Sequence, residues 1–442
     1  MKEHLANAGW GVLDYVAYPL GMLLVAPVIL RNMGSAQYGV WMVATAAVTI
    51  GSIIACGFSD ANIQQVAHHR GRTSREELLR TVRCMVAIHL LLATVLGLLM
   101  WCLAPHAAGR VVSTSGALRQ DCLRSFELAA ALLWVRAMES VCISTQRAFA
   151  RYGEAVRISA LARLLSLIAA ASLTYIAHSV AAMLAAALVL NVLGTRWQYV
   201  QLQKLLGGGS LLPAWDGAAL KALIAFGSWS WLLAVSGIIF SQVDRLYLGV
   251  STGAVAVASY ALCTQLAQPI YGIAASGLHF LFPYLAERRA SHASSDLRSA
   301  VLTGLTCNLL FVAAASAVLV FFGPAILRIL AGKEIAADAA PLLHIIVAGT
   351  AIFAMSVTAT YALFAFRRVG IVTALNLAGG AVMFLLMLYL TPRMGAFGPA
   401  YARLSYGVIT LCLYIPLVSE WKSEGSVDRS SLPAADAMWE EI

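Results

Sequence analysis

Charged side chains are scarce in this chain. They make up only 12% of its 442 residues, whereas hydrophobic residues make up 60%. Soluble domains carry roughly a quarter charged residues, and most hydrophobic runs here have no polar face for water to cover. The shortage of charge therefore excludes a soluble globular protein and predicts an all-α integral membrane protein that crosses the bilayer many times.

The sequence also lacks the patterns that metal sites and membrane-bound enzymes require. Its eight cysteines lie mostly inside hydrophobic runs, and none belongs to a Cys-x-x-Cys or Cys/His cluster. No connecting loop is long enough for a soluble domain, and the longest outer loops, 105–124 and 323–340, show no recognisable catalytic arrangement. We expect no cofactor, no metal site and no enzyme, and a membrane-embedded glycosyltransferase, polymerase or ligase ranks below a transporter.

Twelve hydrophobic runs reach the about 20 residues that a membrane-spanning helix needs. A flexible polar stretch, Gly207 to Ser210, lies close to the midpoint of the chain. We predict two pseudo-symmetric six-helix halves (1–206 and 222–420), a cytoplasmic linker (207–221) and a polar cytoplasmic tail (421–442). The predicted spans are 10–30, 38–58, 82–104, 125–146, 158–177, 181–203, 222–248, 254–282, 299–322, 341–366, 369–390 and 398–419.

Positive charge is unevenly divided between the two sets of loops. With the N-terminus inside, the cytoplasmic segments hold eighteen Lys and Arg residues and the outer loops hold seven. Because cytoplasmic loops carry the excess of Lys and Arg, both termini are predicted to be cytoplasmic. This asymmetry accounts for most of the net charge of +9, so a nucleic-acid partner is not needed to explain it.

The sequence pattern suggests one helical unit used twice. The run that starts at Trp10 leads through a polar hinge to Tyr38, 28 residues later. A related run leads from Trp229 through Asp244 to Tyr260 over 31 residues. Internal repeats of this kind are common in secondary transporters, whose substrate sites lie near the membrane midplane between the halves.

Short motifs in both halves resemble the Wzx-type polysaccharide flippases, which belong to the same superfamily as the MATE exporters and the lipid II flippases. The motifs are Arg31 and Gly34 with Tyr38-Gly39-Val40-Trp41, Gly57-Phe58-Ser59-Asp60, Asp244 to Gly249 with Ser259-Tyr260, and Phe282-Pro283. The resemblance implies a V-shaped pair of six-helix lobes. By alternating access they would move an undecaprenyl-pyrophosphate-linked oligosaccharide across the bacterial cytoplasmic (inner) membrane, for surface polysaccharide or O-antigen synthesis. A monomer and a polysaccharide polymerase as partner are the accompanying expectations.

Ionisable residues inside the spans are the candidate functional residues, because each costs roughly 2.5–3.5 kcal/mol to insert at the bilayer centre. Arg136 lies about eleven residues into its span, roughly 16 Å deep, and Glu139 shares its helix face. In one interpretation the two side chains neutralise each other between helices. In the other they face the cavity, where Arg136 would bind a pyrophosphate and Glu139 would orient its guanidinium group or transfer a proton. Arg163 either joins this site or extends toward the cytoplasmic headgroups.

Asp14 is either an interfacial carboxylate or, beside the helix-kinking Pro19, part of a gate. The resemblance to MATE exporters implies proton coupling at such an acid; sodium coupling stays open. At the outer end, Asp244 and Arg245 are either interfacial anchors or an outer gate between the lobes, and Arg403 would line the outer exit.

A MATE-like antiporter for small cationic molecules is the alternative function. It would need an acidic cavity with Asp14 or Glu139 unpaired. The spans instead carry five arginines against three acids, a net charge of +2, which favours an anionic cargo.

Overall fold

The structure is a computed structural model that describes residues 2–71, 75–114, 116–149, 151–208, 210–279, 281–282, 284–285, 294–366 and 368–426. For residues 2–17, 68, 70–71, 152, 226, 229–230, 233, 236, 238–240, 294–296 and 421–426 the structure describes the backbone but not the side chains. Every regular element in the described residues is a helix. The predicted all-α class is therefore confirmed.

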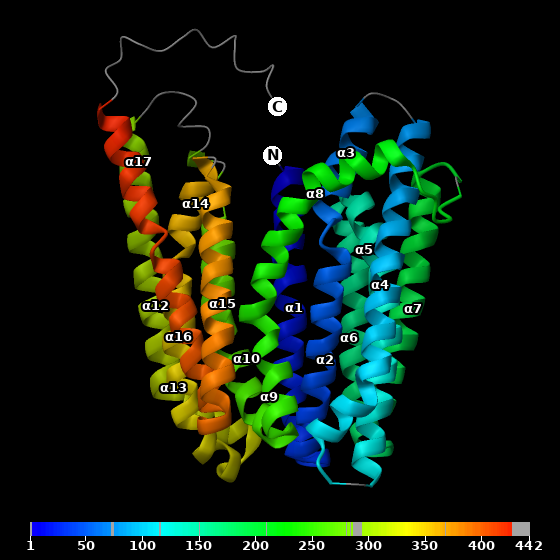
Figure 1. Cartoon of the computed structure of the whole chain (residues 1–442), viewed down its shortest axis with the longest axis vertical. Coiled ribbons are helices and arrows are strands. Elements are labelled where there is room, and N and C mark those ends of the chain that lie inside the picture. Colours follow the sequence, from blue (N-terminus) through cyan, green and yellow to red (C-terminus); the bar gives the residue numbers. More distant parts are fainter. Residues whose placement is uncertain are drawn as a thin grey trace.

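The helices form two groups that stand side by side (Figure 1). The first group is α1 (Lys2–Met33), α2 (Ser35–Cys56), α3 (Ser59–Gly71), α4 (Arg75–Val111), α5 (Ala117–Ala148), α6 (Tyr152–Ile176) and α7 (Val180–Leu205). The chain then runs through α8 (Gly217–Ile238), a π-helical turn η1 (Ile239–Val243), α9 (Asp244–Thr252), α10 (Ala254–Leu278), α12 (Ser294–Ala331), α13 (Lys333–Met355), α14 (Val357–Ala365), α15 (Val369–Met394), α16 (Phe397–Leu411) and α17 (Tyr414–Ser426).

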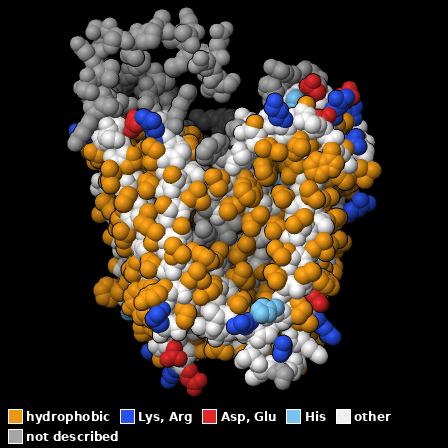
Figure 2. Space-filling view, viewed as in Figure 1, with side chains coloured by type: hydrophobic (Ala, Val, Ile, Leu, Met, Phe, Trp, Pro, Cys, Tyr) orange, Lys and Arg blue, Asp and Glu red, His pale blue; other side chains and the backbone are white. Residues whose placement is uncertain are grey.

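Within the described residues, eight helical segments are long and apolar enough to cross a membrane, which confirms a multi-pass membrane protein. They include α2, α4, α6, α7, α12 and α15 together with the runs 333–365 and 397–420. Figure 2 shows hydrophobic side chains over the middle of one face and charged side chains near its two ends. The predicted spans on α1, α5, α8–α9 and α10 are not among the eight, so the count of twelve stays a prediction.

We call the end where α1 begins and α17 ends the upper end, and the end where α1 meets α2 the lower end (Figure 1). At the lower end the predicted seven-residue hinge, 31–37, is only one residue long. Gly34 alone separates α1 from α2, with φ 90°. Gly253, before α10, and Gly332, before α13, have φ 92° and 85°. Glycine is required at all three breaks because other residues strongly disfavour positive φ.

These breaks correct the register of the internal repeat. Gly34 and Gly253 share the same backbone conformation at the start of α2 and of α10. Counting four residues from each glycine pairs Tyr38 with Val257, so the two tyrosines that the sequence suggested as counterparts are not equivalent.

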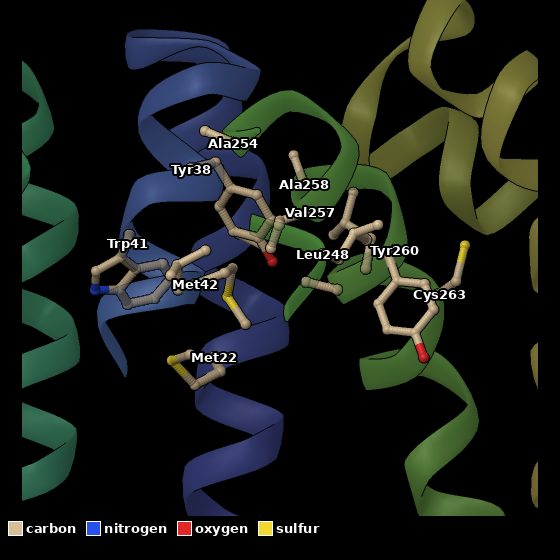
Figure 3. Packing of buried hydrophobic residues seen from close by; sticks show 14 of the residues in the cluster. Met22, Tyr38, Trp41, Met42, Leu248, Ala254, Val257, Ala258, Tyr260 and Cys263 are labelled. Carbon is tan, nitrogen blue, oxygen red and sulfur yellow. The ribbon is translucent and has the colours of Figure 1, made fainter. Parts of the chain in front are cut away.

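The two groups meet along α2 and α10, and they approach most closely at the lower end. A Cβ atom on Gly39 would lie 1.8 Å from the carbonyl oxygen of Ala254, so only glycine allows this approach. Tyr38 is fully buried, and its hydroxyl donates to Oε1 of Gln265 at 3.5 Å. Figure 3 shows Tyr38 and Met42 of α2 beside Ala254, Val257 and Ala258 of α10. The lower end is therefore closed.

The segment between α7 and α8 is held against α4 where it is described, although the sequence suggested a flexible linker. Arg83 Nε donates to the carbonyl of Leu212 at 3.0 Å, and the N–H of Ala214 donates to the carbonyl of Arg83 at 3.3 Å. Residues 217–221 of the predicted linker belong to the first turns of α8.

Candidate functional site

Arg136, Glu139 and Arg163 form a buried charged group in the first half. Arg136 and Glu139 are three residues apart on α5, so they share one helix face. Arg136 Nη1 lies 2.7 Å from Glu139 Oε2, and Arg163 Nη2 on α6 lies 4.0 Å from Glu139 Oε1. The Glu139 side chain is only 5% exposed, whereas those of Arg136 and Arg163 are 17% and 24% exposed. The carboxylate therefore sits between two guanidinium groups that reach a more open space.

That space is a cavity of about 390 Å³ with an excess of positive charge. Besides the three residues above, Arg147 and Asp60 contribute charged side chains to its wall. Three arginines face two carboxylates, so the described charges sum to +1. The full lining consists of Ser52, Ile53, Cys56, Gly57, Ser59, Asp60, Ile63, Arg136, Glu139, Ser140, Ile143, Ser144, Arg147, Arg163 and Ala234.

One wall of this cavity comes from α8, the first helix of the second half, through Ala234. Trp231 fixes α8 there, since its Nε1 donates to the carbonyl of Ile54 at 2.9 Å and its ring stacks on Phe58 with 6.2 Å between centroids. Gly57 and Gly227 leave room for these two rings. The cavity therefore lies where the two halves meet, above the closed contact between α2 and α10.

The middle of α1 lies near the charged group. Tyr18, beside Pro19, is close enough to Arg136 and Arg163 to interact with both electrostatically. The helix α1 continues through Pro19 without a break. Asp14 lies one turn before Tyr18 in α1, and its side chain lies outside the described ones.

The remaining predicted charges gather near the lower end. Asp244 is fully buried and accepts hydrogen bonds from Tyr260 Oη at 2.5 Å, Arg403 Nη1 at 2.6 Å and the backbone N–H of Arg245 at 2.8 Å. The Arg245 guanidinium points away from that carboxylate and donates to Thr264 at 2.8 Å. As expected for neighbours on a helix, Asp244 and Arg245 do not pair through their side chains.

This lower cluster joins α9, α10 and α16, which all belong to the second half. In this conformation the bonds across the halves are made by other residues, so a gate role for Asp244 and Arg245 stays a prediction. Tyr38 bonds Gln265, and Arg31 Nη2 donates to the carbonyl of Ile329 at 2.9 Å. The structure thus separates two charged groups, one lining the upper cavity and one buried below it.

A family model described as "Polysaccharide biosynthesis protein" matches residues 5–289, which is well over half of the chain. The chain belongs to this polysaccharide biosynthesis family. A search of curated proteins finds no match.

Solved structures share the fold of this family member at low sequence identity. The lipid II flippase MurJ in an inward closed conformation superposes with a TM-score of 0.74 at 11% identity, covering 95% of this chain and 90% of that one. An inward-facing multidrug resistance MATE transporter of the MOP superfamily gives 0.72 at 14% identity, covering 94% and 99%. An outward-facing MATE transporter gives 0.56 at 14% identity, covering 94% and 97%. The predicted MATE-like fold is therefore confirmed.

Several residues of this polysaccharide biosynthesis protein were not identified as site residues from the sequence. Arg147 was assigned to a loop, and Asp60 was noted only as part of a motif, yet both line the upper cavity. Their signal was weak because helices α3 and α5 extend beyond the hydrophobic runs that marked the spans.

Several uncharged polar residues inside the spans connect neighbouring helices. Asn191 bonds Ser166, Asn308 bonds the carbonyl of Ala354, and Tyr406 bonds Asn376. Such bonds hold neighbouring helices together inside a membrane, where water cannot replace them.

Proposed function

We propose that this protein is a flippase that moves an undecaprenyl-pyrophosphate-linked oligosaccharide across the bacterial cytoplasmic membrane by alternating access. The observation that carries this proposal is the positively charged cavity between the halves, in which Arg136 and Arg163 flank Glu139. Membership of a polysaccharide biosynthesis family supports a glycan cargo. The orientation with both termini in the cytoplasm would open this cavity toward the side on which the cargo is made.

The arginine pair suits the pyrophosphate for a chemical reason. A guanidinium is planar and always charged, and it binds phosphate oxygens through two parallel N–H bonds. The 2.7 Å hydrogen bond that Arg136 donates to Glu139 fixes one edge of the guanidinium, which leaves its other N–H groups in a fixed orientation for a ligand. Glu139 also limits the cost of the buried positive charge while the cavity is empty.

Release on the other side requires the lower end to open. Separation of α2 from α10 would break the Tyr38–Gln265 bond and expose the cluster around Asp244. In the proposed cycle Arg245 and Arg403 then meet the departing anion, and Asp244 keeps them buried until that moment. Asp14 would couple the movement to protons or sodium, with α1 bending near Pro19 as the ion binds.

The rival function, export of a small cation by a MATE-like antiporter, predicts an acidic cavity. The described wall instead has one more positive than negative charge, and its best-buried acid, Glu139, is paired with two arginines. A cation would meet repulsion there, whereas an anion would be attracted.

A pair of double variants tests the proposed phosphate site. Arg136→Met with Glu139→Gln removes both charges of the buried ion pair, so Arg163 also loses its neighbouring carboxylate, and Arg80→Met with Glu76→Gln removes a similar 2.6 Å pair from the exposed start of α4. Each is expressed in a deletion strain that has no second flippase, and surface polysaccharide is measured at matched protein level. Loss of one charge-assisted phosphate contact, worth roughly 1.5–3 kcal/mol, predicts a decrease of about tenfold to a hundredfold for the buried pair only.

Arg136→Lys tests the contribution of the planar guanidinium geometry apart from that of the charge, since lysine keeps the charge but cannot bind two oxygens in one plane. We expect intermediate output from this variant. Full polysaccharide output from both Arg136 variants would remove the residue from the site. Display of surface polysaccharide by the deletion strain itself would refute the flippase function.

A further inference from the structure

A second cavity lies inside the second half, between α10 and α12. Its volume is about 690 Å³, larger than that of the charged cavity, and it begins near the upper ends of the two helices. The lining residues are Ile273, Ala274, Gly277, Leu278, Leu281, Tyr284, Ser299, Ala300, Thr303, Gly304, Cys307, Asn308 and Phe311.

The lining repeats once per helical turn, so the cavity follows the length of the two helices. On α10 the wall includes Ile273 and Gly277, with Leu281 beyond the end of that helix, and on α12 it includes residues four apart from Ala300 to Asn308. The α12 wall extends over about twelve residues, and at a rise of 1.5 Å each these correspond to roughly 18 Å, more than half of a bilayer's hydrocarbon core. The cavity therefore runs from the upper boundary of the membrane toward its middle.

Small residues keep this space open. A Cβ atom placed on Gly277 would meet no described atom within 4 Å, so the glycine faces the empty volume. A Cβ atom on Gly304, across the cavity, would lie 3.2 Å from a methyl group of Leu281, so that side is already filled. The difference identifies Gly277 as the position where a larger side chain would occupy the cavity rather than distort the helices.

The wall is uncharged and mostly apolar. None of the described lining residues is acidic or basic. Thr303 donates its hydroxyl proton to the carbonyl of Ser299, and Asn308 donates its amide N–H to the carbonyl of Ala354, so these donors are already used. Only 11% of the most hydrophobic stretch of α12 is buried, so most of that stretch is not covered by other described helices.

We propose that this cavity binds the polyprenyl chain of the lipid-linked cargo while its pyrophosphate lies in the charged cavity between the halves. The inference rests on the proposed function. The reason is a match of charge: the proposed cargo has an anionic head and an uncharged chain. The protein has one cavity lined by three arginines and another whose described lining is uncharged.

The position of α10 connects the two cavities. This helix contacts α1 and α2 of the first half and also forms one wall of the apolar cavity. A chain that lies along α10 stays in hydrocarbon while the head moves through a polar space, so neither part is transferred into an unfavourable medium. A lipid-linked substrate with its chain free in the bilayer would have no such guide.

The test uses the full-length protein in phosphatidylcholine nanodiscs and a polyprenyl phosphate that carries a photoactivatable diazirine in its chain. Labelled peptides are mapped by mass spectrometry. We expect labelling of α10 and α12, and a decrease of about tenfold in Gly277→Phe, since a phenyl group would take the place of a chain segment worth at least 1.4 kcal/mol of binding. The matched control is Gly370→Phe, at an exposed glycine of α15 whose Cβ would also meet no described atom.

Competition decides between lipid sources. Protection by unlabelled polyprenyl phosphate, with none from phosphatidylglycerol at the same concentration, supports the proposal. Equal protection by both lipids would overturn it, because the cavity would then be a site for ordinary acyl chains. Labelling outside α10 and α12, or equal labelling of Gly277→Phe and wild type, would also overturn it.

A vesicle assay with the wild type keeps this inference separate from the proposed function. Labelling of α10 and α12 without any flipping of a lipid-linked oligosaccharide would refute the flippase function and support the polyprenyl site. Flipping of the lipid-linked oligosaccharide together with labelling outside α10 and α12 would support the flippase function and refute the polyprenyl site.

Discussion

The closest approach of the two halves predicts the effect of one added methyl group. In Gly39→Ala the new Cβ would lie 1.8 Å from the carbonyl oxygen of Ala254 and 2.5 Å from its carbonyl carbon. Both are backbone atoms, so no side-chain rotation can relieve the overlap. To restore an ordinary contact of about 3.5 Å, α2 and α10 must separate by roughly 1.7 Å. Alanine should therefore oppose the closed lower end.

The size of the effect follows from the cost of overpacking, about 1–3 kcal/mol. This cost falls on the state in which α2 and α10 touch, and it disappears when the lower end opens. The gain in helix propensity from glycine to alanine, about 1 kcal/mol, is the same in both states and cancels. The ratio of lower-open to lower-closed protein should rise by roughly fivefold to a hundredfold.

Electron–electron distance measurements can detect this change. Spin labels at Ser113 and Lys333, which are exposed near the lower end of the first and second half, report the separation of the halves there. The eight native cysteines are free and are replaced beforehand. We expect a longer distance to gain population in Gly39→Ala and no change in Gly370→Ala, whose added methyl meets no described atom. A folded Gly39→Ala protein with the wild-type distance distribution would refute the reasoning.

Two further predictions concern buried contacts. Asp244→Asn removes the only described carboxylate of the lower cluster and should lower stability by roughly 3–5 kcal/mol, because the buried Arg403 loses its counter-charge. Thermal unfolding in detergent should show partial recovery of stability when Arg403→Gln is added. Equal instability of the single and double variants would contradict this reasoning. Trp231→Phe keeps the stacking on Phe58 but loses the hydrogen bond to the carbonyl of Ile54, so stability should fall by about 1 kcal/mol. An unchanged unfolding temperature would show that this hydrogen bond does not hold α8 in place.

Much of the fold could be predicted from the sequence because the bilayer imposes a simple rule. A segment that crosses it must be apolar and helical over about 20 residues, and the hydrophobic runs follow the observed helices closely. The same rule marked Arg136, Glu139 and Asp244 as functional candidates, since an ionisable residue inside such a run is costly to insert into the bilayer. Helical spacing alone placed Arg136 and Glu139 on one helix face, and their side chains lie 2.7 Å apart.

The partners of the other charges could not be predicted, because they depend on how distant helices pack. Nothing in the local sequence shows that Asp244 pairs with Arg403, 159 residues away, rather than with a residue of the first half. Likewise, the polar residues of 31–37 suggested a loop, but a single positive-φ glycine suffices to join α1 and α2. The apolar cavity between α10 and α12 was also unforeseen, since its walls read as ordinary hydrophobic helix.

In the proposed cycle, the balance of forces at the lower end explains how this closed end can open. Asp244 neutralises one of two buried arginines, so the cluster keeps an excess of one positive charge. No described atom accepts a hydrogen bond from Arg245 Nε, which is buried. An uncompensated buried charge costs several kcal/mol, and water entering on opening would remove that cost. The charge cluster therefore favours opening, while the glycine-permitted packing of α2 on α10 favours closure. Because the two terms oppose each other, a binding energy of only a few kcal/mol at the upper cavity can decide which end is open.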